Sequence, residues 1–126
     1  IPMEIQPLMD TFWPGPLTLV FESHPDIPAQ LVGGTGTIAV RISSNAVCAK
    51  FLSTLGAPIT ATSANPSGSQ PASMPKEVIA YFNGKIDVLI DGGKLPGILG
   101  STIVDVTGDK IKIIREGEIP SAEILS

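Results

Sequence analysis

Glycine and proline are unusually frequent in this chain and set strict limits on its backbone. The sequence holds 13 glycines and 12 prolines among 126 residues, whereas the two together average roughly 12% of a globular chain. Proline fixes φ and glycine permits left-handed backbone, so the excess predicts many tight turns and several loops of enforced geometry. The length suits one domain with a real core and is too short for two.

Hydrophobic periodicity between these breakers predicts helices and strands that alternate. The expected helices cover residues 5–12, 44–55 and 75–82. The expected strands cover residues 17–21, 37–43, 57–63 and 87–93, followed by a hairpin within 101–117 around Thr-Gly-Asp. Ser43 or Ser44 should cap the second helix and Gly56 should end it, while Ser73 should cap the third. This order predicts an α/β fold with a mixed parallel and antiparallel sheet flanked by helices.

Charge and cysteine content exclude several classes of protein. A net charge of −4 with only 8 basic residues argues against a general nucleic-acid binder, because phosphate attraction needs an excess of Lys and Arg. The single cysteine, Cys48, rules out an internal disulfide and suits a reducing compartment. No run approaches the ~18 apolar residues of a membrane helix. We therefore expect a cytoplasmic protein without a membrane partner.

The commonest catalytic and nucleotide-binding patterns do not occur in the sequence. It contains neither a GxxxxGK(S/T) phosphate loop nor a GxGxxG fingerprint. His24 precedes a proline in a loop-like stretch, which is typical of a solvated side chain. Cys48 falls on the apolar face of the expected 44–55 helix, which favours a buried structural thiol over a nucleophile. Ser63 and Ser67 have no neighbouring His or Lys to activate them, so a hydrolase is disfavoured.

The stretch ITATSANPSG, residues 59–68, moves from an apolar run directly into hydroxyl and amide side chains. Ser63, Asn65 and Ser67 offer hydrogen-bond donors, while the proline and the last glycine fix the bend. Such a loop at a strand end is typical of an anion site, although the same residue types make ordinary turns. These residues alone leave both readings open.

Two arginines occur in otherwise apolar strands. Arg41 lies in the 37–43 run, and Arg115 ends the second strand of the hairpin. A buried guanidinium needs a partner, and its fork geometry suits a carboxylate or a phosphate. The partner is either a ligand or one of the chain's 12 acidic residues.

Five stretches, in their order, carry a resemblance to a known family. They are FWPGPLTLVF, TIAVR, PITATSANPSG, DGG, and STIVDV followed by IIREG. From Leu8 to Gly117 the chain resembles the YrdC-like family of threonylcarbamoyl-AMP synthases. The first and third stretches together are the most specific. The resemblance implies a YrdC/RibB-like fold, a twisted mixed sheet with an open, positively lined cavity.

The same resemblance implies a nucleotidyltransferase. It would join L-threonine, bicarbonate and ATP into threonylcarbamoyl-AMP and release pyrophosphate, with Mg2+ on the ATP phosphates. The product would pass to a tRNA threonylcarbamoyl transferase complex that forms N6-threonylcarbamoyladenosine at position 37 of tRNA. No nucleophilic residue is needed, because the protein positions the reactants and neutralises their charge. Weak binding of tRNA or double-stranded RNA stays open.

The family motifs imply two sets of binding residues, with no catalytic nucleophile and no metal ligand. The residues implied for ATP are Thr37, Ser63, Asn65, Ser73 and Arg115. The residues implied for threonine are Arg41, Ala61, Ser101 and Thr102. Ser73 has two readings, because SQPAS leaves its register open and a helix cap explains it equally. The stretch RISSN departs from the family's usual Arg-Val-Pro, which keeps Arg41 and alters its flank.

The family's N-terminal part, with its first strand and Lys-x-Arg motif, is not found in these residues. We therefore expect residues 1–126 to be the C-terminal portion of one YrdC-like domain, with about 80 further residues before Ile1. The 126 residues alone are then expected to be inactive. Two alternatives stay open: the carbamoyltransferase domain of hydrogenase maturation proteins, and a non-catalytic RNA-binding paralogue.

Overall fold

The computed structural model describes residues 5–96 and 99–126, which divide into two compact units. The first unit comprises the described residues up to 57 and from 99 onward, and the second comprises those between. Within these described ranges, no helix is long and apolar enough to cross a membrane.

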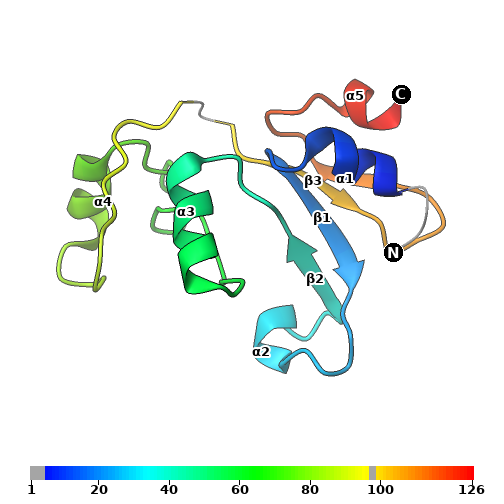
Figure 1. The fold of residues 1–126 in the computed structure, drawn as a ribbon, viewed down its shortest axis with the longest axis horizontal. Helices are drawn as coiled ribbons and strands as arrows, with labels where there is room; N and C mark the ends of the chain where they lie inside the picture. Colours follow the sequence, from blue (N-terminus) through cyan, green and yellow to red (C-terminus); the bar gives the residue numbers. More distant parts are fainter. Residues whose placement is uncertain (1–4, 97–98) are drawn as a thin grey trace. The chain divides into compact units, whose positions relative to one another are not determined.

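The first unit is built on one four-stranded mixed sheet (Figure 1). Its elements in chain order are α1 (Gln6–Phe12), β1 (Leu17–Glu22), α2 (Ala29–Val32), β2 (Thr37–Val40), α3 (Ala46–Leu55), β3 (Thr102–Asp105), β4 (Lys112–Arg115) and α5 (Ser121–Leu125). The strand order is β2-β1-β3-β4, with β1 antiparallel to β2, parallel to β3, and β3 antiparallel to β4. The predicted α/β class, mixed sheet and C-terminal hairpin are therefore confirmed.

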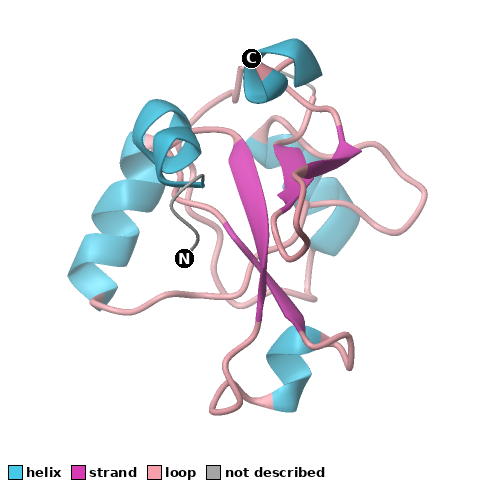
Figure 2. Cartoon of the chain, turned by 90° about the vertical axis from the view of Figure 1, so that its right-hand side faces the viewer, coloured by secondary structure: helices cyan, strands magenta, loops and turns pink. Residues whose placement is uncertain are grey.

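The core of this unit lies on one face of the sheet. Leu17 and Leu19 of β1 are fully buried, because alternate side chains of a strand point to the same face. Thr102 and Val104 of β3 pair with them in register and are also fully buried. α1 and α5 add Leu8, Ile124 and their neighbours to the same cluster, so these helices cover this face. The connection from β1 to β2 contains α2, at the end of the strand pair where β1 finishes and β2 begins (Figure 2).

Asn45 caps α3, so the predicted cap at Ser43 or Ser44 is wrong. Its Oδ1 accepts hydrogen bonds from the backbone N–H groups of Val47 at 3.0 Å and Cys48 at 3.1 Å. Ser43 instead uses its hydroxyl to accept from the N–H of Asn45, at 3.1 Å. Asparagine caps a helix as well as serine does, and here it stands directly before the first turn. The helix ends at a left-handed glycine, residue 56, as predicted.

The second unit contains α4 (Pro75–Phe82) and the loops on either side of it. The backbone N–H of Ala72 donates to the Ala64 carbonyl at 3.0 Å, and the hydroxyl of Tyr81 donates to the Gln70 carbonyl at 3.0 Å. These bonds hold the loop that precedes α4 as one folded piece.

The strands predicted over 57–63 and 87–93 are wrong. Neither segment is a strand, and Val88 in the second one is 77% exposed. A run of β-branched residues forms a strand only where a neighbouring strand takes up its backbone hydrogen bonds, and the sheet that the described residues form consists of β1 to β4 alone. Two smaller differences are that β2 ends at Val40, before the predicted end at residue 43, and that the structure has a C-terminal helix, α5, where none was predicted.

Candidate functional site

Four polar side chains gather at one end of the sheet in the first unit: Thr18, Arg41, Ser101 and Arg115. β1 and β3 begin at this end, whereas β2 and β4 finish there. Thr18 lies between the buried Leu17 and Leu19, and Ser101 precedes the buried Thr102, so strand alternation places both on the face opposite the core. We call this set the polar row.

Ser101, which directly precedes β3, is hydrogen-bonded to residues of β1 and β4. Its hydroxyl lies 2.7 Å from the Thr18 hydroxyl oxygen, a hydrogen bond between β1 and the start of β3. Its carbonyl accepts from Nε of Arg115 at 3.2 Å and from Nη2 at 2.8 Å. Ser101 is only 8% exposed, so this arrangement is held within the fold. The predicted placement of Ser101 at the start of one strand and of Arg115 at the end of another is confirmed.

A shift in strand register directs Arg115 toward Ser101. Residues 113 and 115 of a regular strand would share a face, and Ile113 packs against the core. Ile103 pairs with Arg115, yet the next residue, Val104, pairs with Ile113. β4 therefore accommodates one additional residue at this point, and such bulges commonly re-aim a side chain.

Arg41 follows β2 directly, and its Nε donates to the Gly15 carbonyl at 3.2 Å. Both Arg41 and Arg115 are exposed, so the expectation that they are buried is wrong. In the described part of the chain no carboxylate lies within 4.0 Å of either guanidinium, and the ion pair found there joins His24 and Asp26 at 3.4 Å. The structure thus gives no internal salt bridge to these arginines, and each keeps N–H donors that can bind an anion.

The acid next to Arg115 is engaged elsewhere. Glu116 Oε1 accepts a hydrogen bond of 2.6 Å from the backbone N–H of Ser121, at the start of α5. This bond lowers the pKa of Glu116 below its usual value. The pKa of Asp105 is lowered in the same way by the hydroxyl and N–H of Thr107, at the far end of β3. Neither carboxylate neutralises the polar row.

The two arginines lie on the outer strands of the sheet. β2 and β4 are separated by β1 and β3, so three spacings of about 4.8 Å put their axes roughly 14 Å apart. Each side chain reaches inward from its strand, Arg41 to the Gly15 carbonyl just before β1 and Arg115 to the Ser101 carbonyl just before β3.

Thr102, predicted to bind threonine, has its side chain fully engaged inside the fold. Its hydroxyl donates to the Ile119 carbonyl at 2.6 Å and accepts from the N–H groups of Gly117 at 2.9 Å and Ile119 at 3.1 Å. Its backbone N–H donates to the Pro16 carbonyl. Thr102 therefore fixes the segment that follows β4.

Thr37, predicted to bind ATP, begins β2 and so lies at the opposite end of that strand from Arg41. Its hydroxyl oxygen is 2.9 Å from that of Thr35. The structure does not bring Thr37 into the polar row.

The loop in the second unit carries Ala61, Ser63 and Asn65, and the first two are exposed. The side-chain amide of Asn65 donates to the carbonyls of Pro66 at 3.0 Å and Ser69 at 2.9 Å. These two bonds fix the orientation of the amide, because only its NH2 end can donate to carbonyls. Among the described residues, the opposite Oδ1 is buried and accepts no hydrogen bond. This loop is therefore a folded turn that holds an unused acceptor.

Ser73, the other residue of the second unit predicted to bind ATP, does not cap α4. The N-cap position is Met74, which makes no side-chain cap bond. The Ser73 hydroxyl instead donates to Glu77 Oε1 at 3.3 Å. The helix begins with Pro75, whose backbone nitrogen carries no hydrogen. The first turn of α4 therefore has one donor fewer to satisfy.

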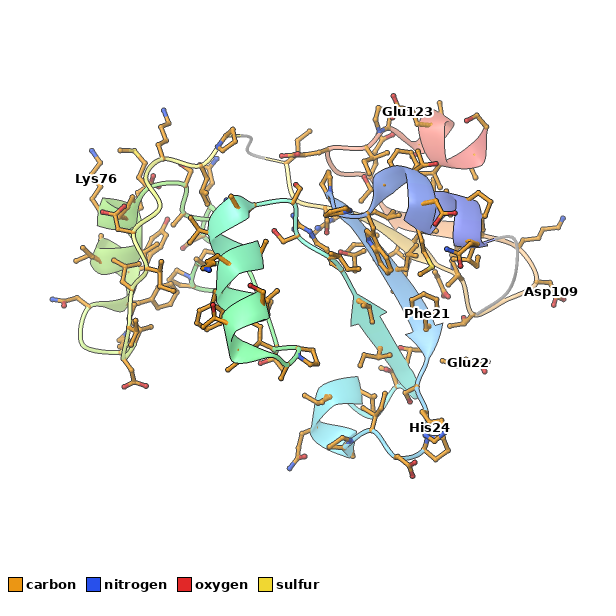
Figure 3. The ribbon with its side chains drawn as sticks, viewed as in Figure 1. Phe21, Glu22, His24, Lys76, Asp109 and Glu123 are labelled. Atoms are coloured by element: carbon orange, nitrogen blue, oxygen red, sulfur yellow. The ribbon has the colours of Figure 1, made fainter. Side chains whose placement is uncertain are left out.

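Two further residues that the sequence singled out lie outside the polar row. His24 is on the loop beyond the end of β1, the end opposite the polar row (Figure 3). Cys48 is exposed, so the expectation of a buried thiol is wrong. Across residues 5–96 and 99–126, no cluster of three His, Cys, Asp or Glu side chains could hold a metal ion.

Sequence reasoning missed two residues of the site. Thr18 could be recognised only from the register of β1 against β3, because that register places the Thr18 hydroxyl beside Ser101. Gly100 lies under the guanidinium of Arg115, where a Cβ would be 2.7 Å from Nη2. In the sequence, the pair Gly-Ser before a β-branched run could have signalled a close backbone approach.

Known proteins resemble this chain in both sequence and fold. The family described as "Telomere recombination", with members Sua5, YciO and YrdC, matches residues 1–117. A threonylcarbamoyl-AMP synthase of Pyrococcus abyssi is 38% identical over 124 residues, which are 98% of this chain and 36% of that protein. A threonylcarbamoyl-AMP synthase of Schizosaccharomyces pombe is 34% identical, over 100% of this chain and 32% of that protein.

Solved structures agree with these sequence matches. The crystal structure of P. abyssi Sua5 complexed with L-threonine has a TM-score of 0.93 at 38% identity, over 98% of this chain and 36% of that one. E. coli YciO has a TM-score of 0.87 at 30% identity, over 95% of this chain and 59% of that one. This chain thus spans less than two thirds of the length of each of these proteins.

Proposed function

The chain belongs to the Sua5, YciO and YrdC family, and on that basis we propose that it forms part of a threonylcarbamoyl-AMP synthase. The observation that carries this proposal is the pair Arg41 and Arg115. Both lie at one end of one sheet, each is held by a backbone carbonyl, and no carboxylate of the described residues neutralises either. Two such groups suit a reaction between a carboxylate substrate and a triphosphate.

Arg41 would bind the carboxylate of L-threonine, and Arg115 would bind the phosphates of ATP. This division rests on the family motifs, and each guanidinium is held by a different backbone carbonyl. L-Threonine is the ligand in the similar P. abyssi Sua5 structure. Ser101 would complete the threonine site beside Arg115, with its hydroxyl oriented by Thr18. Thr102 would act by holding the backbone of that site.

The chemistry needs charge neutralisation and alignment. The amine of threonine takes up bicarbonate with loss of water, and a carbamate forms. A carbamate oxygen then attacks the α-phosphorus of ATP, while the bond from that phosphorus to the pyrophosphate oxygen breaks. Negative charge develops on the departing pyrophosphate, where the guanidinium of Arg115 would stabilise it.

The family motifs also imply four residues of the second unit. We assign Ser63, Asn65 and Ser73 to ATP, and Ala61 to threonine. Asn65 is also assigned on the family motif, since its Oδ1 is buried within the loop and is not accessible to a nucleotide in this structure. Thr37 is assigned to ATP on the family motif alone.

Mg2+ would enter with ATP. The described residues offer no cluster of acidic side chains for a protein-held metal, and Mg2+ commonly binds substrate phosphates while it keeps most of its waters. The ion would neutralise phosphate charge, and no residue of this chain is assigned to it. The product, threonylcarbamoyl-AMP, would be consumed in the cytoplasm by the enzyme complex that modifies tRNA.

The proposal is tested in the full protein that carries this chain, by ATP–pyrophosphate exchange that depends on threonine and bicarbonate. Arg115→Ala should weaken ATP binding in calorimetry by about 10- to 100-fold, the loss expected for a charged hydrogen-bonding group. Arg41→Ala should raise the KM for threonine by a similar factor and leave ATP affinity nearly unchanged. Lys112→Ala removes a charge from the same strand as Arg115 and serves as the control. Exchange that needs no threonine would overturn the proposal.

A further inference from the structure

We propose that Gly100 is a positioning residue for Arg115. Its lack of a side chain lets the guanidinium lie against the backbone and donate to the Ser101 carbonyl. The inference rests on the assignment of Arg115 to the ATP phosphates, and it adds what sets the orientation of that side chain.

The guanidinium of Arg115 occupies the place that a side chain at Gly100 would take. A Cβ at Gly100 would lie 2.7 Å from Nη2, 3.3 Å from Cζ and 3.7 Å from Nη1. These three nearest atoms all belong to Arg115, so the conflict involves no other residue. Nη2 is also the atom that donates to the Ser101 carbonyl at 2.8 Å.

The backbone of Gly100 permits an alanine. Its φ lies outside the left-handed region, unlike that of Gly93 before it. Its carbonyl accepts a hydrogen bond of 3.0 Å from the N–H of Glu118, which fixes this backbone in place. A methyl group would therefore leave the fold intact and push Nη2 away by about 0.7 Å, to reach an ordinary contact distance.

Gly117 shows the contrast. A Cβ there would meet the carbonyl oxygen of Gly100, and it would lie 2.6 Å from the carbonyl carbon of Ser101. These are backbone atoms that cannot move aside. Gly117 is thus required by the fold, whereas Gly100 is required only by the position of the guanidinium.

The test compares ATP affinity in the full protein by calorimetry. Gly100→Ala should raise the Kd for ATP by about 3- to 10-fold, because a displaced guanidinium keeps only part of its charged hydrogen bonds. Gly108→Ala is the matched control, since a Cβ there has its nearest contact at 3.9 Å. The double variant with Arg115→Ala should bind ATP no more weakly than Arg115→Ala alone.

The possible results separate this inference from the proposed function. Equal weakening by Gly100→Ala with and without Arg115 would overturn it, because glycine would then act through the fold. Full ATP affinity in Gly100→Ala, beside a weakened Arg115→Ala, would overturn it while the proposed function stands. If the wild-type protein binds no ATP, the proposed function fails, and the NMR signal of the Arg115 Nε–H decides instead. Gly100→Ala should shift that signal and speed its exchange with water, and an unchanged signal refutes the positioning role.

Discussion

Replacing Thr102 with valine should destabilise the first unit strongly, although the two side chains have nearly the same shape. The Thr102 hydroxyl is fully buried and makes three hydrogen bonds to the segment 117–119. Valine fills the same space but leaves the N–H groups of Gly117 and Ile119, and the Ile119 carbonyl, without this partner. Ile119 is itself only 5% exposed, so water cannot readily replace the hydroxyl.

The expected cost follows from these contacts. An unsatisfied buried donor costs about 1–3 kcal/mol. The unsatisfied N–H of Ile119 should carry the full cost, and the N–H of Gly117, which is half-buried, should carry part of that cost. We expect Thr102→Val to lower the free energy of unfolding by about 2–4 kcal/mol. Thr102→Ser keeps the hydroxyl, and it should cost only about 1 kcal/mol for the missing methyl group.

Urea denaturation measures both variants. Trp13, the single tryptophan of the chain, donates from Nε1 to the Leu17 carbonyl at 2.7 Å, so its fluorescence reports on this unit. With an m-value of about 1–3 kcal/mol/M, the urea midpoint for Thr102→Val should fall by about 0.7 to 4 M. A valine variant within about 0.5 kcal/mol of wild type, or a serine variant that is equally destabilised, would refute the reasoning.

Two further changes test the helix ends. Asn45→Ala should lower the free energy of unfolding by about 1 kcal/mol, because α3 loses its N-cap, while Ser44→Ala should leave thermal stability unchanged. Glu116 has a pKa lowered below 4.5 by its bond to the N–H of Ser121, so its ionised form stabilises the fold above that pH and this contribution disappears as the pH falls through the lowered pKa. Glu116→Gln should therefore be less stable than wild type near neutral pH, and the difference should vanish in acid. Glu118→Gln is the control, and equal acid sensitivity of both variants would contradict this account.

The sequence predicted those features that local chemistry decides. Gly56 ends α3 and a proline begins α4, because backbone geometry at helix ends selects these residues. The hairpin of β3 and β4 was readable from two apolar runs joined by a Gly-Asp turn. Arg115 could be expected at a strand end because it closes an apolar run, whereas the strand predicted over 37–43 continued past Arg41, and β2 ends at Val40.

Pairing between distant segments could not be read from the sequence. The runs 57–63 and 87–93 have the composition of strands, yet neither belongs to the sheet that the described residues form. The bond from Thr18 to Ser101 depends on how β1 aligns with β3, which no periodicity within either strand sets. The partner of Arg115 proved to be a backbone carbonyl at 2.8 Å, and composition says nothing of carbonyl positions.

The parallel pairing of β1 with β3 also dictates when the polar row can form during synthesis. Its central bond joins residues 83 positions apart, so the row belongs to the slow, high-contact-order part of folding. At about 5–20 residues per second, a ribosome needs roughly 4–17 s to make the chain between those two residues. Among the described strands, β2 alone can pair with β1 during that interval, and the edge that β3 will take lacks this partner. Chaperone binding to nascent chains should therefore persist until β3 emerges.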